Sequence, residues 1–474
     1  MQTARNDDHD DHEALAREAF QRAYPAFAAT ARLDDLRARD YARLDRAEHV
    51  YLDFTGAGLA AESHVRDHAA LLTDGIFGNP HSQSPTSAAA GALVAQARAR
   101  VLAFFDASPD EYEVIFTPNA TGALKLLGES YPFAPGGAFL LTSDNHNSVN
   151  GIREFARAAG AAVDYVAPSA PELRVDAAAL DAAWARARPG TSNLFAYPAQ
   201  SNFSGVQHPL AWVGEAQAHG WDVLLDAASF APTNRLDLGR VHPDFVDLSF
   251  YKMFGYPTGV GCLLARKQAL RKLRRPWFAG GTIAFSSVAG DGHYLLPGAA
   301  GFEDGTVNFL SLPAVTQGLD RLAAIGIDTI HTRVMCLTAW LLERLRGLRH
   351  ANGRPALRLY GPPHSDGRGA TIALNMIDPD DQLRDCDEVE RRAGERGISL
   401  RAGCHCNPGA REAALAIAAP ELRRCFQYAG ARSLDEFMRS IAENTAGVVR
   451  VSLGPITTFG DVFRFARFVE SFNF

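Results

Sequence analysis

The stretch Phe245-Val246-Asp247-Leu248-Ser249-Phe250-Tyr251-Lys252-Met253-Phe254-Gly255 joins a short, mostly apolar run to a lysine and then to a glycine. Residues 245–249 have the composition of a buried strand. Only four of the 47 basic residues are lysines, so this chain uses arginine where a surface charge is enough. An arginine stays protonated, whereas a desolvated lysine amine can lose its proton and attack a carbonyl carbon. We therefore predict that Lys252 is a nucleophile at a strand end; the alternative is a lysine that only caps the strand.

Short β-rich runs alternate with helical stretches around this segment, from about residue 90 to residue 265. Such alternation predicts an α/β fold with a mainly parallel sheet covered by helices. Ligands gather at the carboxyl ends of the strands in such sheets, which is where Lys252 is expected. The predicted strands are 114–117, 138–142, 162–166, 193–197, 223–226, 245–249 and 261–265, with helices at 122–129, 151–159 and 210–219.

From about Leu310 the pattern changes to that of a smaller α+β region. A helical stretch over 312–346, broken near Gly326, is followed by predicted strands and a closing helix. The predicted strands lie at 357–360, 370–376 and 447–453, and the helix at 461–472. We therefore expect four parts: a disordered acidic tail (1–15), a segment that packs with the small domain (16–60), a large domain (61–310) and a small C-terminal domain (311–474).

Composition and charge exclude several classes of function. The net charge of −7 argues against a nucleic-acid partner or an anionic membrane surface. No apolar run reaches the ~18 residues that a membrane span needs. The first 13 residues are polar and acidic, unlike a secretory signal, and six scattered cysteines suit a reducing compartment. We expect a soluble cytoplasmic protein.

Asp226 ends the apolar run 221–226, and Lys252 follows a later strand. A carboxylate in that position needs a positive or donor partner, because unpaired desolvation is costly. An acid and an amine at the ends of neighbouring parallel strands form the pair that pyridoxal 5′-phosphate requires. The amine binds the cofactor covalently, and the acid keeps the pyridine nitrogen protonated. The alternative is an aspartate that caps its strand.

The segment Asn119-Ala120-Thr121-Gly122 follows a predicted strand and opens a predicted helix. Its backbone N–H groups and the Thr121 hydroxyl can face an anion, which predicts a phosphate cradle. An ordinary helix N-cap is the alternative.

The turn-forming segment Leu400-Arg401-Ala402-Gly403-Cys404-His405-Cys406-Asn407-Pro408-Gly409 carries an arginine, an imidazole and two thiols. An arginine can bind a carboxylate with two hydrogen bonds, and a thiolate beside a cation is a nucleophile. Zinc is the competing interpretation, but a Cys-x-Cys pair alone gives too few ligands, so we expect no metal. Arg450, among valines in a predicted strand, indicates either an anionic ligand or a structural ion pair.

Taken together, these segments resemble pyridoxal-phosphate enzymes of the class V aminotransferase group, specifically the cysteine desulfurases. Within that group the chain most resembles the desulfurase-like N-terminal domain of molybdenum cofactor sulfurases. Ser229 and Tyr251, where many desulfurases have glutamine and histidine, agree with the sulfurase pattern. The resemblance runs from about residue 45 to the C-terminus and rests on residues 51–58, 78–82, 144–149, 197–205, 248–261, 401–410 and 450–452.

For the cofactor, the resemblance implies the fold type I transferase fold, with a mainly parallel seven-stranded sheet in the large domain. Lys252 would hold the cofactor covalently, Asp226 would pair with the pyridine nitrogen, and His146 would stack on the ring and act in catalysis. Thr306 would reach the phosphate of a partner subunit in a homodimer. The other implied cofactor-binding residues are Ala120, Thr121, Asn202, Ser229, Ser249 and Tyr251.

For the reaction, the resemblance implies a cysteine desulfurase that converts L-cysteine to L-alanine and leaves a persulfide on Cys406 for an acceptor protein or cofactor. Arg450 would bind the substrate carboxylate with Arg401 nearby, and Asn202, Ala57 and His81 would also contact the substrate. One alternative is a C–S lyase, aminotransferase or epimerase on the same fold, with Cys406 not catalytic. A non-catalytic sulfur carrier is the other.

Overall fold

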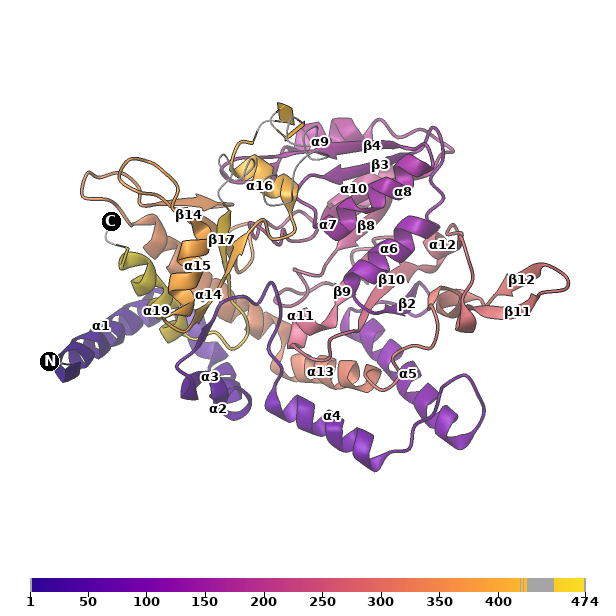
Figure 1. Cartoon of the computed structure of the whole chain (residues 1–474), viewed down its shortest axis with the longest axis horizontal. Coiled ribbons are helices and arrows are strands. Elements are labelled where there is room, and N and C mark those ends of the chain that lie inside the picture. The colour runs from indigo at the N-terminus through magenta and orange to yellow at the C-terminus, as the bar shows by residue number, and fades with distance from the viewer. Residues whose placement is uncertain (1, 418, 421, 424–446, 473–474) are drawn as a thin grey trace, which may run out of the picture.

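A seven-stranded sheet forms the centre of the larger lobe in the computed structural model, which describes residues 2–417, 419–420, 422–423 and 447–472 (Figure 1). Its strand order is β2-β10-β9-β8-β7-β3-β4. All seven strands predicted between residues 114 and 265 are present, with ends shifted by two residues at most. They are β2 (Tyr112–Thr117), β3 (Ala138–Thr142), β4 (Ala162–Val166), β7 (Asn193–Pro198), β8 (Asp222–Asp226), β9 (Phe245–Ser249) and β10 (Gly261–Arg266).

Five neighbouring strands of this sheet are parallel, and β10 runs antiparallel to both of its neighbours, β2 and β9. The parallel strands β3, β7, β8 and β9 are almost entirely buried, as expected for a sheet with helices on each side, whereas the edge strand β4 is partly exposed. One face is covered by α6 (Ala120–Ser130) and α8 (Ile152–Ala158). The other is covered by α5 (Pro85–Phe104), α9 (Ala177–Trp184), α10 (Trp212–Ala218) and α13 (Leu312–Ile325).

A second, antiparallel sheet forms the smaller lobe, in the order β13-β14-β17-β16. Its apolar core is shared with helices α14 (Ile327–Arg346), α15 (Cys386–Gly394) and α19 (Phe459–Glu470). Three residues of the N-terminal segment, Phe20, Val50 and Leu52, belong to the same core. The strands are β13 (Leu357–Tyr360), β14 (Thr371–Met376), β16 (Arg401–Gly403) and β17 (Val448–Ser452), of which only β16 was not predicted.

The helical stretch predicted over 312–346 is broken at Gly326, which has a positive φ of 84°. The helix before the break, α13, buries Leu312, Val315 and Leu319 in the core of the larger lobe. The predicted domain limit at residue 310 would therefore separate α13 from the sheet that it covers. We propose instead that the large domain ends near Gly326, and we keep the predicted limits at residues 15 and 60 as proposals.

The N-terminal segment differs from the disordered tail predicted over residues 1–15, because α1 spans Gln2–Ala23. Acidic composition alone suggested disorder, but charges spaced four residues apart also support a helix. Arg17 pairs with Glu13 in this way. Further along, the Phe20 ring is buried and lies 4.8 Å from the Phe459 ring, so α1 is held against α19.

The described part of the chain contains no helix with both the length and the apolar character needed to cross a bilayer.

Candidate active site

Nine of the predicted site residues line one cavity of about 260 Å³ at the carboxyl ends of the parallel strands. They come from the ends of β2, β3, β7, β8 and β9 or from the segments that follow them. The last four strands are neighbours in the sheet, and only β10 separates β9 from β2. This is where ligands bind in sheets of this kind. The nine residues are Ala120, Thr121, His146, Asn202, Asp226, Ser229, Ser249, Tyr251 and Lys252.

Lys252 lies on a short helix, α11 (Phe250–Phe254), which begins directly after β9. The helix ends at Gly255, whose φ of 79° is the left-handed conformation that favours glycine. A β-carbon at Gly255 would lie only 2.1 Å from the backbone of Leu59, so no side chain fits there. The Gly58 N–H donates to the Tyr251 carbonyl at 3.1 Å. The residue before Lys252 and the helix end after it are thus both fixed by the segment around residues 58–59.

Asp226 is the last residue of β8 and lies in the cavity wall. Its Oδ1 accepts a hydrogen bond of 3.0 Å from the Ala228 N–H, which is the strand-end capping that its position suggested. The capping and the proposed role are compatible, because Oδ2 is left for a ligand that carries a proton on nitrogen.

Asp247, which sequence reasoning did not single out, lines the same cavity on β9. It is paired with Asp226 in the β8–β9 register and is completely buried. Neither carboxylate oxygen has a hydrogen-bond partner among the described residues. Burial raises the pKa of Asp247 well above its usual range, and the nearby Asp226 raises it further, although Lys252 opposes both. The sequence feature that could have identified Asp247 is its position as the one acid within the predicted apolar strand 245–249.

We predict that replacing Asp247 with asparagine removes a pH dependence from stability. The folded protein holds the Asp247 proton more tightly than the unfolded chain does. The stability contributed by the protonated group is therefore present below about pH 4 and is lost as the pH rises toward the folded pKa. Above about pH 4, the wild-type free energy of unfolding should fall relative to Asp247→Asn by up to about 1.4 kcal/mol per pH unit. Urea unfolding of the cofactor-free proteins at several pH values measures this difference, and parallel curves would show that Asp247 does not titrate.

The segment before α6 forms a helix N-cap and also faces the cavity. The Asn119 side chain accepts a hydrogen bond of 2.8 Å from the Gly122 N–H, so the N-cap interpretation is confirmed. The Thr121 hydroxyl lies 2.8 Å from the Ser148 hydroxyl, and both residues line the cavity. The N–H groups at the start of a helix have no acceptor within the helix and favour an anion. A phosphate fits here without displacing the cap.

His146 begins α7 (Asn147–Asn150) and lines the cavity. Its Nδ1 accepts a hydrogen bond of 3.1 Å from the Ser148 N–H, so a neutral ring carries its proton on Nε2. Burial lowers the pKa of His146, and the nearby Lys252 lowers it further. The ring is therefore neutral at physiological pH, as a group that stacks on a cationic ring should be.

Cys406 lies in a tight turn formed by residues 404–407. The Asn407 N–H donates to the Cys404 carbonyl at 3.1 Å, which closes the turn. Both central residues, His405 and Cys406, have positive φ angles of 55° and 54°. Each such residue other than glycine costs roughly 1–2 kcal/mol. The Cys406 side chain is exposed at this turn, so strain and exposure coincide at the predicted nucleophile.

Hydrogen bonds from the larger lobe hold this turn in place. Asn202 donates its side-chain N–H to the His405 carbonyl at 2.7 Å and accepts from the Asn407 side chain at 2.9 Å. The Asn147 N–H, next to His146 in the cavity wall, donates to the Cys406 carbonyl at 2.7 Å. The turn therefore stands directly beside the cavity.

The His405 imidazole anchors the turn to the smaller lobe. Its Nε2 donates to the Val448 carbonyl at 2.9 Å, and the ring is buried. Burial lowers the pKa of His405 to about 3, and the positive charge of Arg450 contributes. The anchor therefore stays neutral throughout the physiological pH range.

Arg401 and Arg450 lie opposite each other on β16 and β17. Both form ion pairs with Asp53, so the structural interpretation of Arg450 is confirmed. Burial lowers the pKa of Arg450, whereas the hydrogen bond to Asp53 raises that of Arg401.

Six predicted residues do not line the cavity: Arg401, Cys406 and Arg450, described above, and Ala57, His81 and Thr306. The Ala57 carbonyl accepts a hydrogen bond of 3.0 Å from the Tyr51 hydroxyl. His81 lies against Gly281, and Thr306 accepts a hydrogen bond of 3.3 Å from the Asn79 side chain. His81 and Thr306 therefore belong to a separate, exposed region of this chain.

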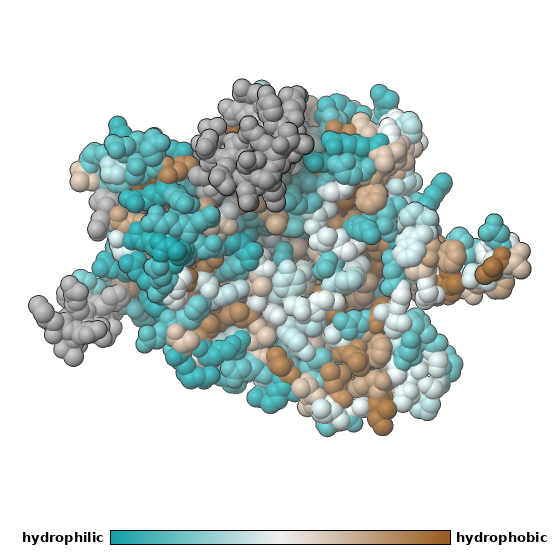
Figure 2. Space-filling view, viewed as in Figure 1, coloured by the Kyte–Doolittle hydropathy of each residue, from teal (hydrophilic) through white to brown (hydrophobic). Residues whose placement is uncertain are grey.

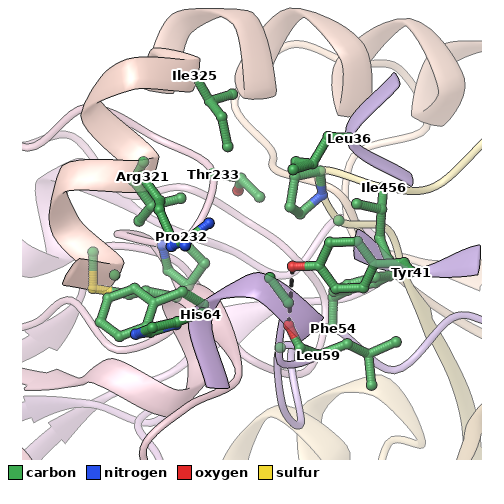
Figure 3. Close-up of a pocket in the computed structure, with 18 of the residues that line it drawn as sticks. Leu36, Tyr41, Phe54, Leu59, His64, Pro232, Thr233, Arg321, Ile325 and Ile456 are labelled. Atoms are coloured by element: carbon green, nitrogen blue, oxygen red, sulfur yellow. Dashed lines mark hydrogen bonds between the residues drawn. The ribbon is translucent and has the colours of Figure 1, made fainter. Parts of the chain in front are cut away.

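A second cavity of about 340 Å³ also reaches Lys252 and has mostly apolar walls (Figure 3). Two of its polar groups already have partners. The Tyr41 hydroxyl donates to the Leu59 carbonyl at 3.2 Å, and His64 Nε2 donates to the Ala314 carbonyl at 2.8 Å.

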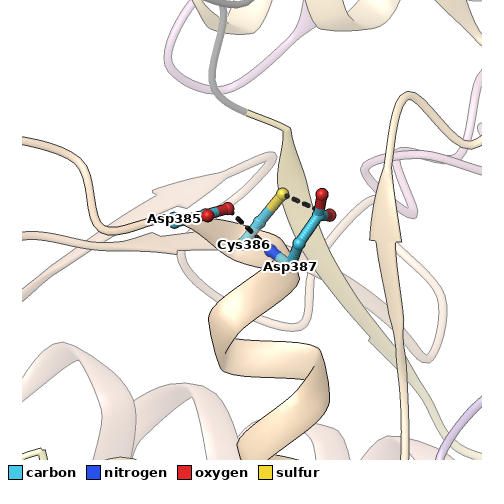
Figure 4. Close-up of side chains that lie close together, drawn as sticks. All are labelled: Asp385, Cys386 and Asp387. Atoms are coloured by element: carbon cyan, nitrogen blue, oxygen red, sulfur yellow. Dashed lines mark hydrogen bonds between the residues drawn. The ribbon is translucent and has the colours of Figure 1, made fainter.

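Asp385, Cys386 and Asp387 bring three potential metal ligands within 4.8 Å of one another (Figure 4). The Asp385 carboxylate, however, accepts from the Asp387 N–H at 2.9 Å and caps α15. Burial raises the pKa of Cys386 to about 12, which keeps the thiol protonated and makes it a poor ligand. Helix capping explains this cluster.

The chain belongs to the aminotransferase class-V family, whose model matches residues 50–465. It is similar to the molybdenum cofactor sulfurases of Solanum lycopersicum (36% identity over 93% of this chain and 57% of the relative) and Arabidopsis thaliana (38%, 93% and 58%). It thus spans a little over half the length of these relatives. The fold is that of an apo cysteine desulfurase from Thermococcus onnurineus NA1, with a TM-score of 0.76, 22% identity and coverage of 93% of this chain and 97% of the other.

The donor set of the first cavity fits pyridoxal 5′-phosphate, and this is the cofactor of the site. Lys252 would supply the amine, Asp226 the acceptor for the pyridine N–H, and the N-terminus of α6 the phosphate cradle, and all three line this cavity. His146 supplies a neutral ring at the cavity wall.

Proposed function

We propose that this protein is a pyridoxal-phosphate-dependent cysteine desulfurase that produces L-alanine from L-cysteine and keeps the sulfur as a persulfide on Cys406. One observation carries the proposal: an exposed thiol lies on a strained turn that is hydrogen-bonded to the wall of the cavity containing Lys252. A lyase or an aminotransferase needs no thiol at this position. The relatives named as molybdenum cofactor sulfurases support the same reaction type.

The residues of the site divide the work as follows. Bound pyridoxal phosphate withdraws electrons from the substrate α-carbon. Arg450 binds the substrate carboxylate, and the Lys252 amine accepts the α-proton and later returns a proton to carbon. Asp226 keeps the proton on the ring nitrogen. The turn at residues 404–407 places the Cys406 sulfur where it can reach the substrate thiol.

The sulfur transfer balances without an outside oxidant. Cys406 sulfur forms a bond to the substrate sulfur while the bond between that sulfur and the substrate β-carbon breaks. The electron pair stays with the carbon, which takes up a proton and becomes the methyl group of alanine. The enzyme thiol and L-cysteine thus give an enzyme persulfide and L-alanine.

Incubation of the reconstituted protein with L-cysteine tests this proposal. We expect one alanine per persulfide in the first turnover, and a mass increase of one sulfur atom on the peptide that contains Cys406. Pyruvate and sulfide without a modified peptide would instead identify a C–S lyase.

We also propose a cytoplasmic homodimer. The hairpin of β11 (Ile283–Ser287) and β12 (Gly292–Leu295) projects from the larger lobe and carries apolar side chains at its surface (Figures 1 and 2). Phe285, Val288 and Tyr294 are all exposed on it, which is typical of an association surface. Association of this region would let Thr306 and His81 serve the site of a partner subunit. Light scattering should then give twice the chain mass of 51.2 kDa.

The sulfur acceptor that we propose is the molybdenum cofactor or a protein that carries it, because the relatives named above are molybdenum cofactor sulfurases. The exposed position of Cys406 leaves its sulfur open to an acceptor that approaches from solution. Transfer of labelled sulfur from the Cys406 persulfide to the isolated cofactor tests this choice.

A further inference from the structure

Asp53 joins the two arginines of the site through a single carboxylate. Its Oδ2 accepts hydrogen bonds from Nη2 and Nε of Arg401, at 2.7 and 3.0 Å. Its Oδ1 accepts from Nη2 of Arg450 at 2.8 Å. The Asp53 and Arg450 side chains are 11% and 3% exposed, whereas that of Arg401 is half exposed. The carboxylate therefore connects a buried cation to one that solvent can reach.

The backbone around Asp53 is built for this contact. Asp53 forms a parallel bridge with Ser452, two residues beyond Arg450 on β17. The Gly56 N–H donates to the Asp53 carbonyl at 2.9 Å. A β-carbon at Gly56 would lie 2.5 Å from Asp53 Oδ2 and 2.8 Å from Arg401 Nη2. Any larger residue here would have to displace the two side chains of the ion pair.

Arg450 retains a donor for a second anion. Its Nη1 donates to the Asn202 carbonyl at 2.9 Å, and its Nη2 donates to Asp53. Its buried Nε has no partner among the described residues. Two arginines and one aspartate carry a net charge of +1, so one further carboxylate neutralises the group. One further carboxylate would therefore complete both the charge balance and the hydrogen bonding of this group.

Arg401 connects this group to the reactive turn. It is the first residue of the three-residue strand β16 (Arg401–Gly403), and Cys404 follows directly. A shift of the Arg401 backbone that follows a change in its contact with Asp53 would therefore reach the start of the turn, at Cys404, three residues later. Arg450 is connected to the other side of the turn, because Asn202 donates to the His405 carbonyl.

We infer that Asp53 is a positioning residue that couples binding of the amino-acid carboxylate at Arg450 to ordering of the turn that carries Cys406. The substrate carboxylate competes with Asp53 for the positive charge of Arg450. Asp53 then turns toward Arg401 and holds that guanidinium with both of its oxygens. Substrate binding then tightens the base of a turn that the hydrogen bonds of Asn202 and His405 already hold. This inference rests on the proposed function for the identity of the substrate.

The test compares wild type with Asp53→Asn as holoenzymes. The variant site carries one more positive charge, so KM for L-cysteine should stay the same or fall. We expect kcat to fall about 100-fold, because the sulfur is no longer held in place. Hydrogen–deuterium exchange of the peptide covering residues 401–409 gives a second measurement. Saturating L-alanine should slow exchange in wild type and leave it unchanged in Asp53→Asn.

Two further variants keep the test decisive. Asp34→Asn is the matched control, because it removes the carboxylate that pairs with Arg333, a fully buried arginine outside the site. The kinetics and the exchange response of this variant should match those of wild type. Gly56→Ala keeps every charge but crowds the Asp53–Arg401 contact, so it too should lose the exchange response. It replaces Asp53→Asn in the test if that variant folds poorly. A raised KM with unchanged kcat in Asp53→Asn, or an exchange response like that of wild type, would overturn the inference. Wild type that makes no alanine would contradict the proposed function alone, since the response to L-alanine is measured without turnover.

Discussion

Replacement of Lys252 with alanine is expected to lower the turnover of L-cysteine by about 10⁴-fold or more, the upper range for loss of a group that transfers protons. Lys252 would hold the cofactor and move the substrate α-proton, and it lies with Asp226 in the cavity wall. The measurements are alanine formation and covalent retention of the cofactor after borohydride reduction. In wild type the reduced cofactor should map to the peptide containing Lys252.

Lys125→Ala is the matched control for this experiment. Lys125 is 71% exposed on the surface and pairs with Glu129, away from the cavity. It should leave both measurements unchanged. If Lys252→Ala retains wild-type turnover, or if the reduced cofactor maps to another lysine, the assignment of the cavity is wrong.

Replacement of Cys406 with alanine is the second change with a large expected effect. Persulfide formation should fall below detection, because no other sulfur occupies the turn position that faces the substrate. Cofactor binding should be unchanged, because Cys406 does not line the cavity that holds Lys252. The measurements are labelled sulfur on the protein and the absorbance of the bound cofactor.

Cys404→Ala is the matched control, since Cys404 is also exposed and stands two residues away. It should still form a persulfide on Cys406. If labelled sulfur remains on Cys406→Ala and is absent from Cys404→Ala, then Cys404 rather than Cys406 carries the persulfide.

The sheet could be predicted because the composition of each buried strand shows that it is buried. Runs such as 138–142 and 245–249 are mostly apolar, and this is sufficient to locate a strand that is covered on both faces. The break in the long helix was likewise visible as Gly326. The packing of α13 was not visible, because an apolar helix face does not reveal which sheet it covers.

The chemistry-bearing residues of the site were predicted, but several of their partners were not. Lys252 stands out because lysine is rare in this chain, and Asp226 because an unpaired carboxylate at the end of an apolar strand is costly. Asp53 is 348 residues from Arg401 in the sequence, and only the folded chain brings them together. The hydrogen bonds from Asn202 to the Cys406 turn depend in the same way on contact between the two lobes. Local pattern carries no information about such contacts.

The positive φ angles of His405 and Cys406 offer a way to recognise relatives that have lost the reaction. Glycine or asparagine at position 406 would relax the backbone there. At position 405 the same change would also remove the buried imidazole that donates to the Val448 carbonyl, so the two effects oppose each other. Drift under mutation alone should therefore carry an inactive descendant toward glycine or asparagine at position 406, while position 405 keeps its histidine.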